Sequence, residues 1–356
     1  MRDLLLGRMP TELDFSFSGS MDDFLAAHPD AVCVGKSVNV CLWHGRECMP
    51  LRGGTLASDL AARDLTINAL ALDSAGRLHM HPKAVDDLRN KMMRPASPTA
   101  FADDPTRIFR LARFASRWPD WRIAREAFEQ MRATPKTLLA AIPAERVAKE
   151  MLKALALPRP ARFFRVLAQG DCLSPWFEEH ERARYIPAGP VKWHANSVLG
   201  HSLRLMDELA GDAMAVWMAL CHDLGKIGTD PALLPHHYGH EVRGVPLALT
   251  LAKRLRLPAV YARAGALAAE EHMSTSATRQ PLPRIRSASF HARENVTDTL
   301  YRLSRSRVPS PITIRRYSRR WRNSSFLLMR GSCCTVPPPI ICRMEGSISM
   351  SSSVGE

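Results

Sequence analysis

The sequence predicts an α+β protein in which a small α/β head of strands and helices precedes a long all-helical body. Segments rich in β-branched and apolar residues, typical of strands, lie at 31–34, 37–43 and 65–72. From residue 105 to about residue 275, nearly every segment has the period of a helix instead. The chain of 356 residues also exceeds what one hydrophobic core organises, so we expect at least two domains.

The expected elements follow in order along the chain. Residues 22–27 suit a short helix, and the strand at 65–72 ends in the turn at 73–76. Prolines near residues 119, 135, 143, 158, 175, 187 and 190 divide the helical body. The central apolar run at 214–221 is far too short to cross a membrane. The N-terminus turns polar too early for a signal peptide, so we expect a cytoplasmic protein whose eight cysteines are reduced thiols.

The composition changes near residue 275. Residues 276–356 contain 14 Arg, no Lys and four acidic residues, so most of the chain's net charge of +14 lies in this tail. The positive charge suggests an anionic partner such as nucleic acid. A disordered basic tail has this composition, and we find no sustained helical or strand period in it. A frameshifted gene end fits better, because a GC-rich gene read out of frame yields Arg, Ser and Pro without Lys.

Two acidic residues near the N-terminus are candidate metal ligands. Glu12 and Asp14 stand two positions apart in a strand-like segment, so their side chains point to the same face. Such a pair can hold Mg²⁺ ions for phosphoryl or nucleotidyl transfer. The alternative is a pair of solvated acids on a strand edge.

Arginines mark two further candidate sites. Arg63 precedes the strand at 65–72, where a guanidinium can clamp phosphates; the alternative is a surface ion pair with Asp64. Asp104 suits a helix N-cap with Pro105 as the first helical residue. One turn later, Arg107 begins a stripe of arginines, and the acceptor and donor together can mimic a base edge. The alternative is a capped helix with a solvated basic face.

These motifs, in this order and spacing, resemble the bacterial class II tRNA nucleotidyltransferase and poly(A) polymerase family. The family's opening motif, Gly-Gly-x-Val-Arg-Asp-x-Leu-Leu-Gly, matches at residues 2–7, and its Arg-Arg-Asp-Phe-Thr-Ile-Asn-Ala matches at 63–69. Its Glu-Asp-x-x-Arg, continuing to Arg-x-x-Arg-Phe, matches at 104–114, and residues 142–150 look like the helix after the family's head. The resemblance covers roughly residues 1–275.

The resemblance implies an enzyme that adds C and A nucleotides from CTP and ATP to the 3′ end of tRNA without a template. Glu12 and Asp14 would hold Mg²⁺. The helical body would grip the tRNA mainly through its backbone and shape. The triphosphate would be contacted by Arg2 and Arg63, and the base would be read by Asp104 and Arg107 with support from Arg110.

The chain also departs from the family pattern. It starts inside the opening motif, with Met1 where the family has Val, so we expect that a GTG valine codon was taken as the start. The first metal carboxylate is Glu12 rather than Asp. The family's Asp-Pro appears as His81-Pro82, and no glycine follows before residue 87.

Histidines gather between residues 194 and 272, which hold seven of the thirteen in the chain. Asp223 follows the run at 214–221, and a carboxylate at a helix C-terminus is disfavoured unless a cation binds it. Gly225 would end that helix as its C′ residue. The cluster resembles the HD phosphohydrolase domain fused to some CCA-adding enzymes, whose closing Asp would lie beyond residue 275. The resemblance implies a divalent metal (Mg²⁺, Mn²⁺ or Ni²⁺) on His201, His222 and Asp223, with His236, His237 and His240 as second candidates.

We therefore expect four parts: an incomplete nucleotidyltransferase head at 1–115, an RNA-binding helical body at 116–190, an HD domain at 191–275 and the basic tail at 276–356. The expected partners are tRNA, ATP and CTP, with no membrane. Three alternatives stay open: a poly(A) polymerase, a protein in which only the HD half works as a phosphatase or cyclic phosphodiesterase, and an inactive remnant.

Overall fold

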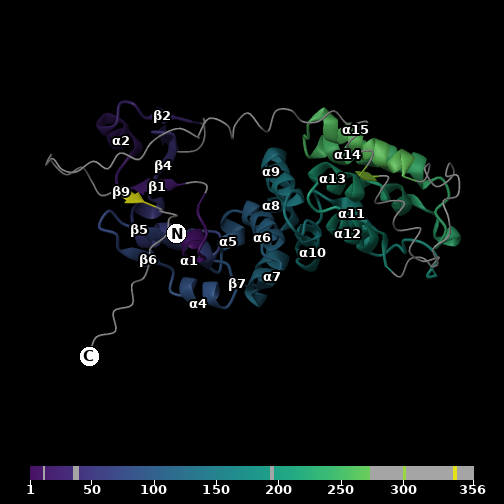
Figure 1. Cartoon of the computed structure of the whole chain (residues 1–356), viewed down its shortest axis with the longest axis horizontal. Coiled ribbons are helices and arrows are strands. Elements are labelled where there is room, and N and C mark those ends of the chain that lie inside the picture. Colours follow the sequence, from purple (N-terminus) through teal and green to yellow (C-terminus); the bar gives the residue numbers. More distant parts are fainter. Residues whose placement is uncertain (11–12, 35–39, 193–195, 273–299, 302–339, 343–356) are drawn as a thin grey trace. The chain divides into compact units, whose positions relative to one another are not determined.

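The computed structural model describes all residues except 11–12, 35–39, 193–195, 273–299, 302–339 and 343–356 (Figure 1). The chain forms two compact units. The head comprises Met1–Asp103, Trp121–Gln130 and Phe326–Glu356, and the helical unit comprises Asp104–Asp120 and Met131–Ser325. In the part of the chain that the structure describes, no helix is both long and apolar enough to cross a membrane.

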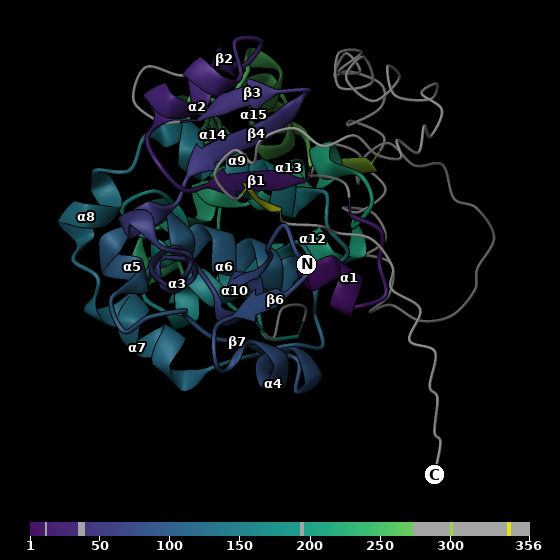
Figure 2. The ribbon, with the colours of Figure 1, turned by 90° about the vertical axis from the view of Figure 1, so that its left-hand side faces the viewer.

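A seven-stranded sheet organises the head. Its strands are β1 (Asp14–Phe17), β2 (Val32–Cys33), β3 (Cys41–Trp43), β4 (Arg46–Pro50), β5 (Leu70–Leu72), β6 (Leu78–Met80) and β9 (Ile340–Cys342). They lie in the order β2-β3-β4-β1-β9-β5-β6, and Figure 2 shows β2, β3, β4 and β1 following one another across the sheet. β1 and β4 pair in parallel, whereas the other neighbours are antiparallel. A separate parallel pair joins β7 (Met92–Met93) to β8 (Arg122–Ile123).

Short helices surround this sheet. The helix expected at 22–27 is confirmed as α2 (Met21–Ala27), which begins at a capping box between Ser20 and Asp23. Its Phe24 stacks on Phe17 of β1 with ring centroids 4.2 Å apart. The other helices that lie in the head are α1 (Arg2–Leu5), η1 (Arg52–Gly54), α3 (Leu56–Ala61), η2 (Thr66–Asn68), α4 (Ala84–Arg89), α5 (Ala100–Asp103) and the start of α7 (Arg125–Ala133).

Several expected strands differ from the observed ones. The strand expected at 65–72 is wrong over its first half, where η2 stands and only β5 is extended. The Asp64 carboxylate explains the difference, because it accepts the amide of Leu65 and the side-chain amide of Asn68, both at 2.8 Å, and so closes a turn. The strand expected at 31–34 is shorter than expected, because β2 covers only residues 32 and 33. Of the strand expected at 37–43, β3 covers 41–43, and residues 37–39 lie outside the described residues. No strand was expected after residue 275, yet the apolar residues 340–342 form β9 beside β1.

The helical unit confirms the helical period expected after residue 105. Buried aromatic rings on α6, on α10 and just before α11 form part of its core: Phe109, Phe163, Phe164 and Phe177. Its helices are α6 (Thr106–Arg117), α8 (Lys136–Ala140), α9 (Ala144–Leu155), α10 (Ala161–Gln169), α11 (Glu178–Ala183), α12 (Val198–Glu208), α13 (Ala213–Cys221), η3 (Leu224–Gly228), η4 (Pro231–Leu233), α14 (His240–Arg254) and α15 (Ala259–Glu271).

Candidate functional site

Asp14 opens strand β1 in the head and shares one face of the sheet with Ser16, because alternate residues of a strand point the same way. Parallel pairing sets Asp14 beside Glu47 of β4, at a strand spacing of about 4.8 Å. Glu47 was not predicted, since no local pattern in the sequence identifies a parallel neighbour. Glu12 lies outside the described residues, so its role as a metal ligand stays a prediction.

Arg63 is buried, so the alternative of a surface ion pair is wrong. Its guanidinium pairs with Asp59, one turn earlier on α3. The fully buried carboxylate of Asp59 also lies 3.2 Å from Nε of Arg52. Burial lowers the pKa of Arg63, and the charge of Asp59 opposes that shift. Two guanidinium groups therefore share one buried carboxylate, an arrangement that suits an incoming phosphate.

Asn68 connects the two predicted phosphate motifs of the head. Its side-chain amide donates to Asp64 at 2.8 Å, and its oxygen accepts from Nη1 of Arg2 at 2.5 Å. Arg2 also pairs with Asp3 at 2.9 Å. The structure thus brings the start of the chain beside residues 63–69, as the predicted triphosphate site requires. Asn68 is a positioning residue whose role was not predicted, because its two partners lie far apart in the sequence.

Asp104 lies at the start of α6 in the helical unit. Its Oδ1 accepts the amide of Thr106, the first residue of the helix, at 3.1 Å. The N-cap is Pro105 rather than Asp104, so the predicted start of the helix is one residue too early. Its Oδ2 accepts from Nη2 of Arg146 on α9 at 2.9 Å. Asp104 is the acceptor that we expect to read a base. Its carboxylate is therefore held by Arg146, an arginine for which no role was predicted.

The arginine stripe on α6 is not a solvated basic face. Arg107 is only 8% exposed. Glu150 of α9, itself buried, pairs with Arg113 and lies 3.9 Å from Nη1 of Arg110. The stripe therefore faces α9 and is ordered by an acidic partner, so the alternative of a solvated basic face is wrong.

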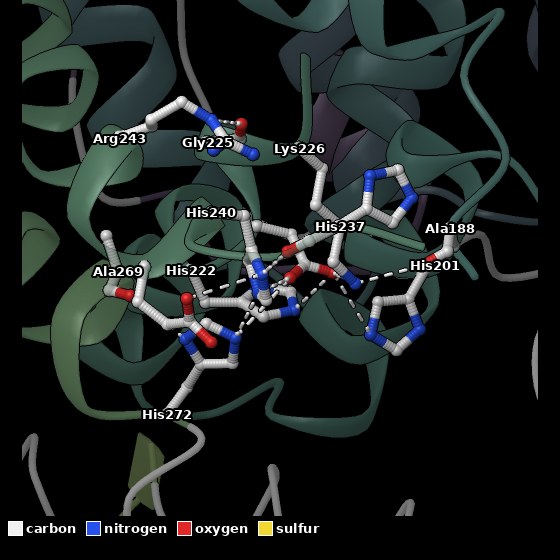
Figure 3. A network of polar contacts seen from close by, with 12 residues as sticks. Ala188, His201, His222, Gly225, Lys226, His237, His240, Arg243, Ala269 and His272 are labelled. Carbon is white, nitrogen blue, oxygen red and sulfur yellow. Dashed lines mark hydrogen bonds and ion pairs between the residues drawn. The ribbon is translucent and has the colours of Figure 1, made fainter. Parts of the chain in front are cut away.

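Asp223 belongs to a buried cluster of histidines in the helical unit. Figure 3 labels four of these histidines, His201, His222, His240 and His272. The cluster combines residues from α12, the end of α13, the first residue of α14 and the residue after α15. Four imidazole Nε2 atoms surround the Asp223 carboxylate, at 3.1 Å for His222, 3.5 Å for His272, 3.6 Å for His240 and 3.7 Å for His201. The structure therefore brings together the three predicted ligands and two further histidines.

Three of these imidazoles are oriented in the same way. Their Nδ1 atoms lie against main-chain carbonyl oxygens three or four residues earlier, at 2.8 Å in His222, 2.6 Å in His240 and 3.0 Å in His272. Because a carbonyl accepts only from N–H, Nδ1 carries the proton and Nε2 is left as an acceptor. The Nε2 atoms of His240 and His272 then face each other at 3.2 Å as two acceptors. A cation bound between them would remove this conflict.

The donor set fits a divalent metal. Nε2 of His222 and both carboxylate oxygens of Asp223 have no hydrogen-bond partner of normal geometry among the residues that the structure describes. Buried polar atoms are otherwise satisfied, so such atoms call for a ligand. Burial alone would raise the pKa of Asp223, yet neighbouring positive charge, including that of Lys226, holds it well below its ordinary value. A charged carboxylate and imidazoles oriented by carbonyl oxygens are the donors that transition metals prefer.

Two cationic side chains border this cluster. Nζ of Lys226 lies 2.8 Å from Oδ2 of Asp223 and donates to the carbonyl oxygen of Ala188 at 2.9 Å. Nη2 of Arg204 lies 3.2 Å from Nδ1 of His201, so an arginine rather than a carbonyl oxygen orients this imidazole. The ring of His201 is therefore held by a guanidinium group, whereas main-chain carbonyl oxygens hold the rings of the other three histidines.

The remaining predicted histidines do not join the cluster. His237 binds the hydroxyl of Thr229 and the carbonyl oxygen of Pro187, both at 2.8 Å, and so supports the surrounding loops. His236 lies beside the ring of Tyr238. Of the three second candidates, His240 alone enters the metal-binding groups found in the described chain. His272 had no predicted role, and only the packing of α15 against α14 places it here.

Gly225 is not the C′ residue of α13, which ends at Cys221, and its φ is not positive. It lies in η3, where a Cβ would come within 1.8 Å of the His240 carbonyl oxygen and 2.6 Å of the Gly244 amide nitrogen. The absence of a side chain lets η3 and α14 touch backbone to backbone. This close crossing brings Asp223 beside His240.

Comparisons with known proteins show what the chain is similar to. Residues 120–184 match the family described as "Probable RNA and SrmB- binding site of polymerase A". The chain is 40% identical over 223 residues to the multifunctional CCA protein of Azoarcus sp. (strain BH72), covering 61% of this chain and 54% of the relative. It is 42% identical over 230 residues to that of Thioalkalivibrio sulfidiphilus, with the same coverage. The chain thus spans about half the length of the curated relatives it matches.

Solved structures share the fold. The CCA-adding enzyme of Bacillus stearothermophilus in complex with CTP aligns with a TM-score of 0.55 at 21% identity, covering 86% of this chain and 72% of that one. A tRNA-processing enzyme in an apo form aligns with a TM-score of 0.52 at 17% identity, covering 86% and 84%. The α+β class expected from the sequence is confirmed.

Proposed function

We propose that this chain belongs to the class II tRNA nucleotidyltransferase and poly(A) polymerase family, and that it adds C and A nucleotides from CTP and ATP to the 3′ end of tRNA. The observation that carries the proposal is the hydrogen-bonded chain from Arg2 through Asn68 to Asp64, beside the buried pair of Arg63 and Asp59. It unites the two motifs that the family uses for triphosphates.

The acidic residues of the head suit Mg²⁺, because Asp14 and Glu47 offer hard oxygen donors on one face of the sheet. Glu12 and Asp14 would hold this ion, which activates a hydroxyl and neutralises phosphate charge when bound. Arg2 and Arg63 would hold the triphosphate in line with the tRNA 3′ hydroxyl. Orientation of the two reacting groups is the chain's own contribution to this step.

In the helical unit, Asp104 and Arg107 would read the Watson–Crick edge of the incoming base. Asp104 would exchange its bond with Arg146 for a bond to the base amino group, while Arg107 donates to a base acceptor. Arg110, beside Glu150, would support this pair. The RNA-binding part predicted at 116–190 overlaps the matched family at 120–184, which supports tRNA as partner.

The histidine cluster supports a second activity, metal-dependent phosphohydrolysis. His201, His222 and Asp223 would hold the metal, and His240 and His272 form a second group of donors with the same carboxylate; Mg²⁺, Mn²⁺ and Ni²⁺ are the candidates. A metal there supplies a nucleophilic hydroxide and a Lewis acid. The chain's own residues orient the imidazoles through carbonyl oxygens. Lys226 adds a positive charge that would neutralise a substrate phosphate.

We further propose the division into a head at 1–115, a body at 116–190, an HD domain at 191–275 and a tail at 276–356, with the protein acting in the cytoplasm where tRNA matures. The test is the purified full chain in two assays with Mg²⁺, Mn²⁺ or Ni²⁺: CTP and ATP incorporation into tRNA lacking its terminus, and phosphate release from cyclic nucleotides. Incorporation limited to A runs would indicate a poly(A) polymerase. Hydrolysis alone would indicate a working HD half, and neither activity an inactive remnant.

A further inference from the structure

Three cysteines form a row across one end of the head sheet. Antiparallel pairing sets Cys33 of β2 opposite Cys41 of β3, and Cys41 opposite Cys48 of β4. Directly opposed residues in antiparallel strands project from the same face, so the three thiols lie side by side. This cysteine row (Cys33, Cys41 and Cys48) takes no part in either site described above.

Access to solvent differs along the cysteine row. Cys33 is exposed, and β2 is the edge strand of the sheet. Cys41 and Cys48 are buried beneath α2, at 0% and 1% exposure. Burial raises the pKa of Cys41 and raises that of Cys48 to about 11. A reagent in solution therefore meets Cys33 first, and the other two thiols can react only with a neighbour inside the sheet.

Hydrogen bonds distinguish the two thiol pairs. The Val34 amide donates to the Val40 carbonyl oxygen at 3.0 Å, so residues 34 and 40 form a hydrogen-bonded pair. The next pair along, Cys33 and Cys41, is then non-hydrogen-bonded, with Cα atoms about 4.5 Å apart and the closest side chains. This spacing falls within the range of about 4.4–6.8 Å that a disulfide tolerates.

The second pair has the other type of spacing. The turn between β3 and β4 consists of His44 and Gly45, both at positive φ, and a two-residue turn of this kind is flanked by a hydrogen-bonded pair. Trp43 and Arg46 are this flanking pair. Hydrogen-bonded pairs recur at every second residue of antiparallel strands, so Cys41 and Cys48 are also a hydrogen-bonded pair, with Cα atoms about 5.5 Å apart. By the spacing of Cα atoms, Cys41 is therefore closer to Cys33, the exposed cysteine, than to Cys48.

We propose that Cys33 and Cys41 are a thiol–disulfide exchange site for small disulfides such as oxidised glutathione. The Cys33 thiolate attacks one sulfur of the small disulfide, which forms a mixed disulfide and releases one small thiolate. Cys41 attacks the Cys33 sulfur, the second small thiolate leaves, and the proton of Cys41 passes to that leaving thiolate. Two protein thiols are oxidised to one disulfide, and one small disulfide is reduced to two thiols. The product ties edge strand β2 to β3.

Peptide mapping tests the proposal. The native full chain is incubated with oxidised glutathione, its free thiols are alkylated under denaturing conditions, and it is digested with trypsin. Cleavage after residues 8, 36, 46 and 52 places each cysteine of the row on its own peptide. We expect the peptide of Cys33 joined to that of Cys41, at least tenfold above any link between Cys41 and Cys48. Cys172 and Cys221, buried in the helical unit, are the internal controls and should stay reduced.

Two variants complete the experiment. Cys33→Ser alters an exposed residue and should abolish the crosslink without unfolding the head, as circular dichroism checks. Cys48→Ser should leave the crosslink unchanged. A dominant link between Cys41 and Cys48, or a glutathione adduct on Cys33 that persists without closing on Cys41, would overturn the proposal. Equal crosslinking in native and urea-unfolded protein would also overturn the proposal, because the link between Cys33 and Cys41 would then not depend on the folded sheet.

Discussion

Replacing Gly225 by alanine should dismantle the histidine cluster without touching any of its side chains. The added Cβ would stand 1.8 Å from the His240 carbonyl oxygen and 2.6 Å from the Gly244 amide nitrogen, whereas ordinary contacts begin at 3.4 Å. Backbone cannot rotate away as a side chain does, so η3 and α14 must separate by roughly 1.5 Å. Overpacking of this kind costs about 1–3 kcal/mol of stability.

The same displacement would break the metal site. Oδ1 of Asp223 and Nε2 of His240 now lie 3.6 Å apart. Metal–ligand distances tolerate deviations of only about 0.2 Å, so a shift of this size removes at least one ligand. We expect Gly225→Ala to weaken Mn²⁺ binding by at least about tenfold.

The assay is Mn²⁺ titration of the full chain by calorimetry, together with thermal unfolding with and without Mn²⁺. Gly228→Ala is the matched control, since it lies in the same element and its Cβ would meet only the Arg243 side chain, at 3.6 Å. It should bind Mn²⁺ as the wild type does. If Gly225→Ala binds Mn²⁺ with unchanged affinity and unfolds at the wild-type temperature, the close crossing does not hold the site together.

Asp14→Asn should lower CTP incorporation into tRNA by about 100-fold or more, whereas Asp22→Asn, at an exposed position of α2, should not; similar rates in the two variants would exclude Asp14 as a metal ligand. Asp104→Ala should raise misincorporation of GTP and UTP more than it lowers the overall rate, and an unchanged nucleotide preference would argue against base reading. Arg254→Met should destabilise the helical unit by about 3–5 kcal/mol at pH 7, since it strands the buried carboxylate of Glu179, with which Arg254 forms bonds of 2.6 and 2.7 Å. Burial alone would raise the pKa of Glu179 but Arg254 lowers it, so the stabilisation is complete above the unfolded pKa of 4.5 and lost as the pH falls through the folded value. Urea midpoints of the wild type and Arg254→Met should therefore converge once the pH has fallen through the folded pKa of Glu179, and a gap that persists in acid would refute the pairing.

The sequence predicted those parts of the fold and sites that depend on local spacing. The capped helix at residues 21–27 and the helical body follow from residue period and turn chemistry. His222 and Asp223 are neighbours in the chain, so their joint presence in a metal cluster was predictable.

Features that depend on contacts distant in sequence were not predictable. His272 enters the cluster only because α15 packs on α14, and nothing near it in the sequence distinguishes it from His236. Asn68 acquires its role from Arg2, some 66 positions away. The extended segment expected before β5 failed for a local reason, because an aspartate side chain competes with the strand for backbone amides.

The mixed pairing of the head sheet has a consequence for the order in which the chain folds. β2, β3 and β4 form a meander, and β5 and β6 a hairpin, so these contacts close over short stretches and can form within microseconds. β1 instead meets its parallel partner β4 across roughly 30 residues, at a larger loop-closure entropy. We therefore expect Asp14 to reach its final alignment late, on a sheet edge already formed, so that the proposed metal-binding carboxylate is positioned only in chains whose other strands have already paired.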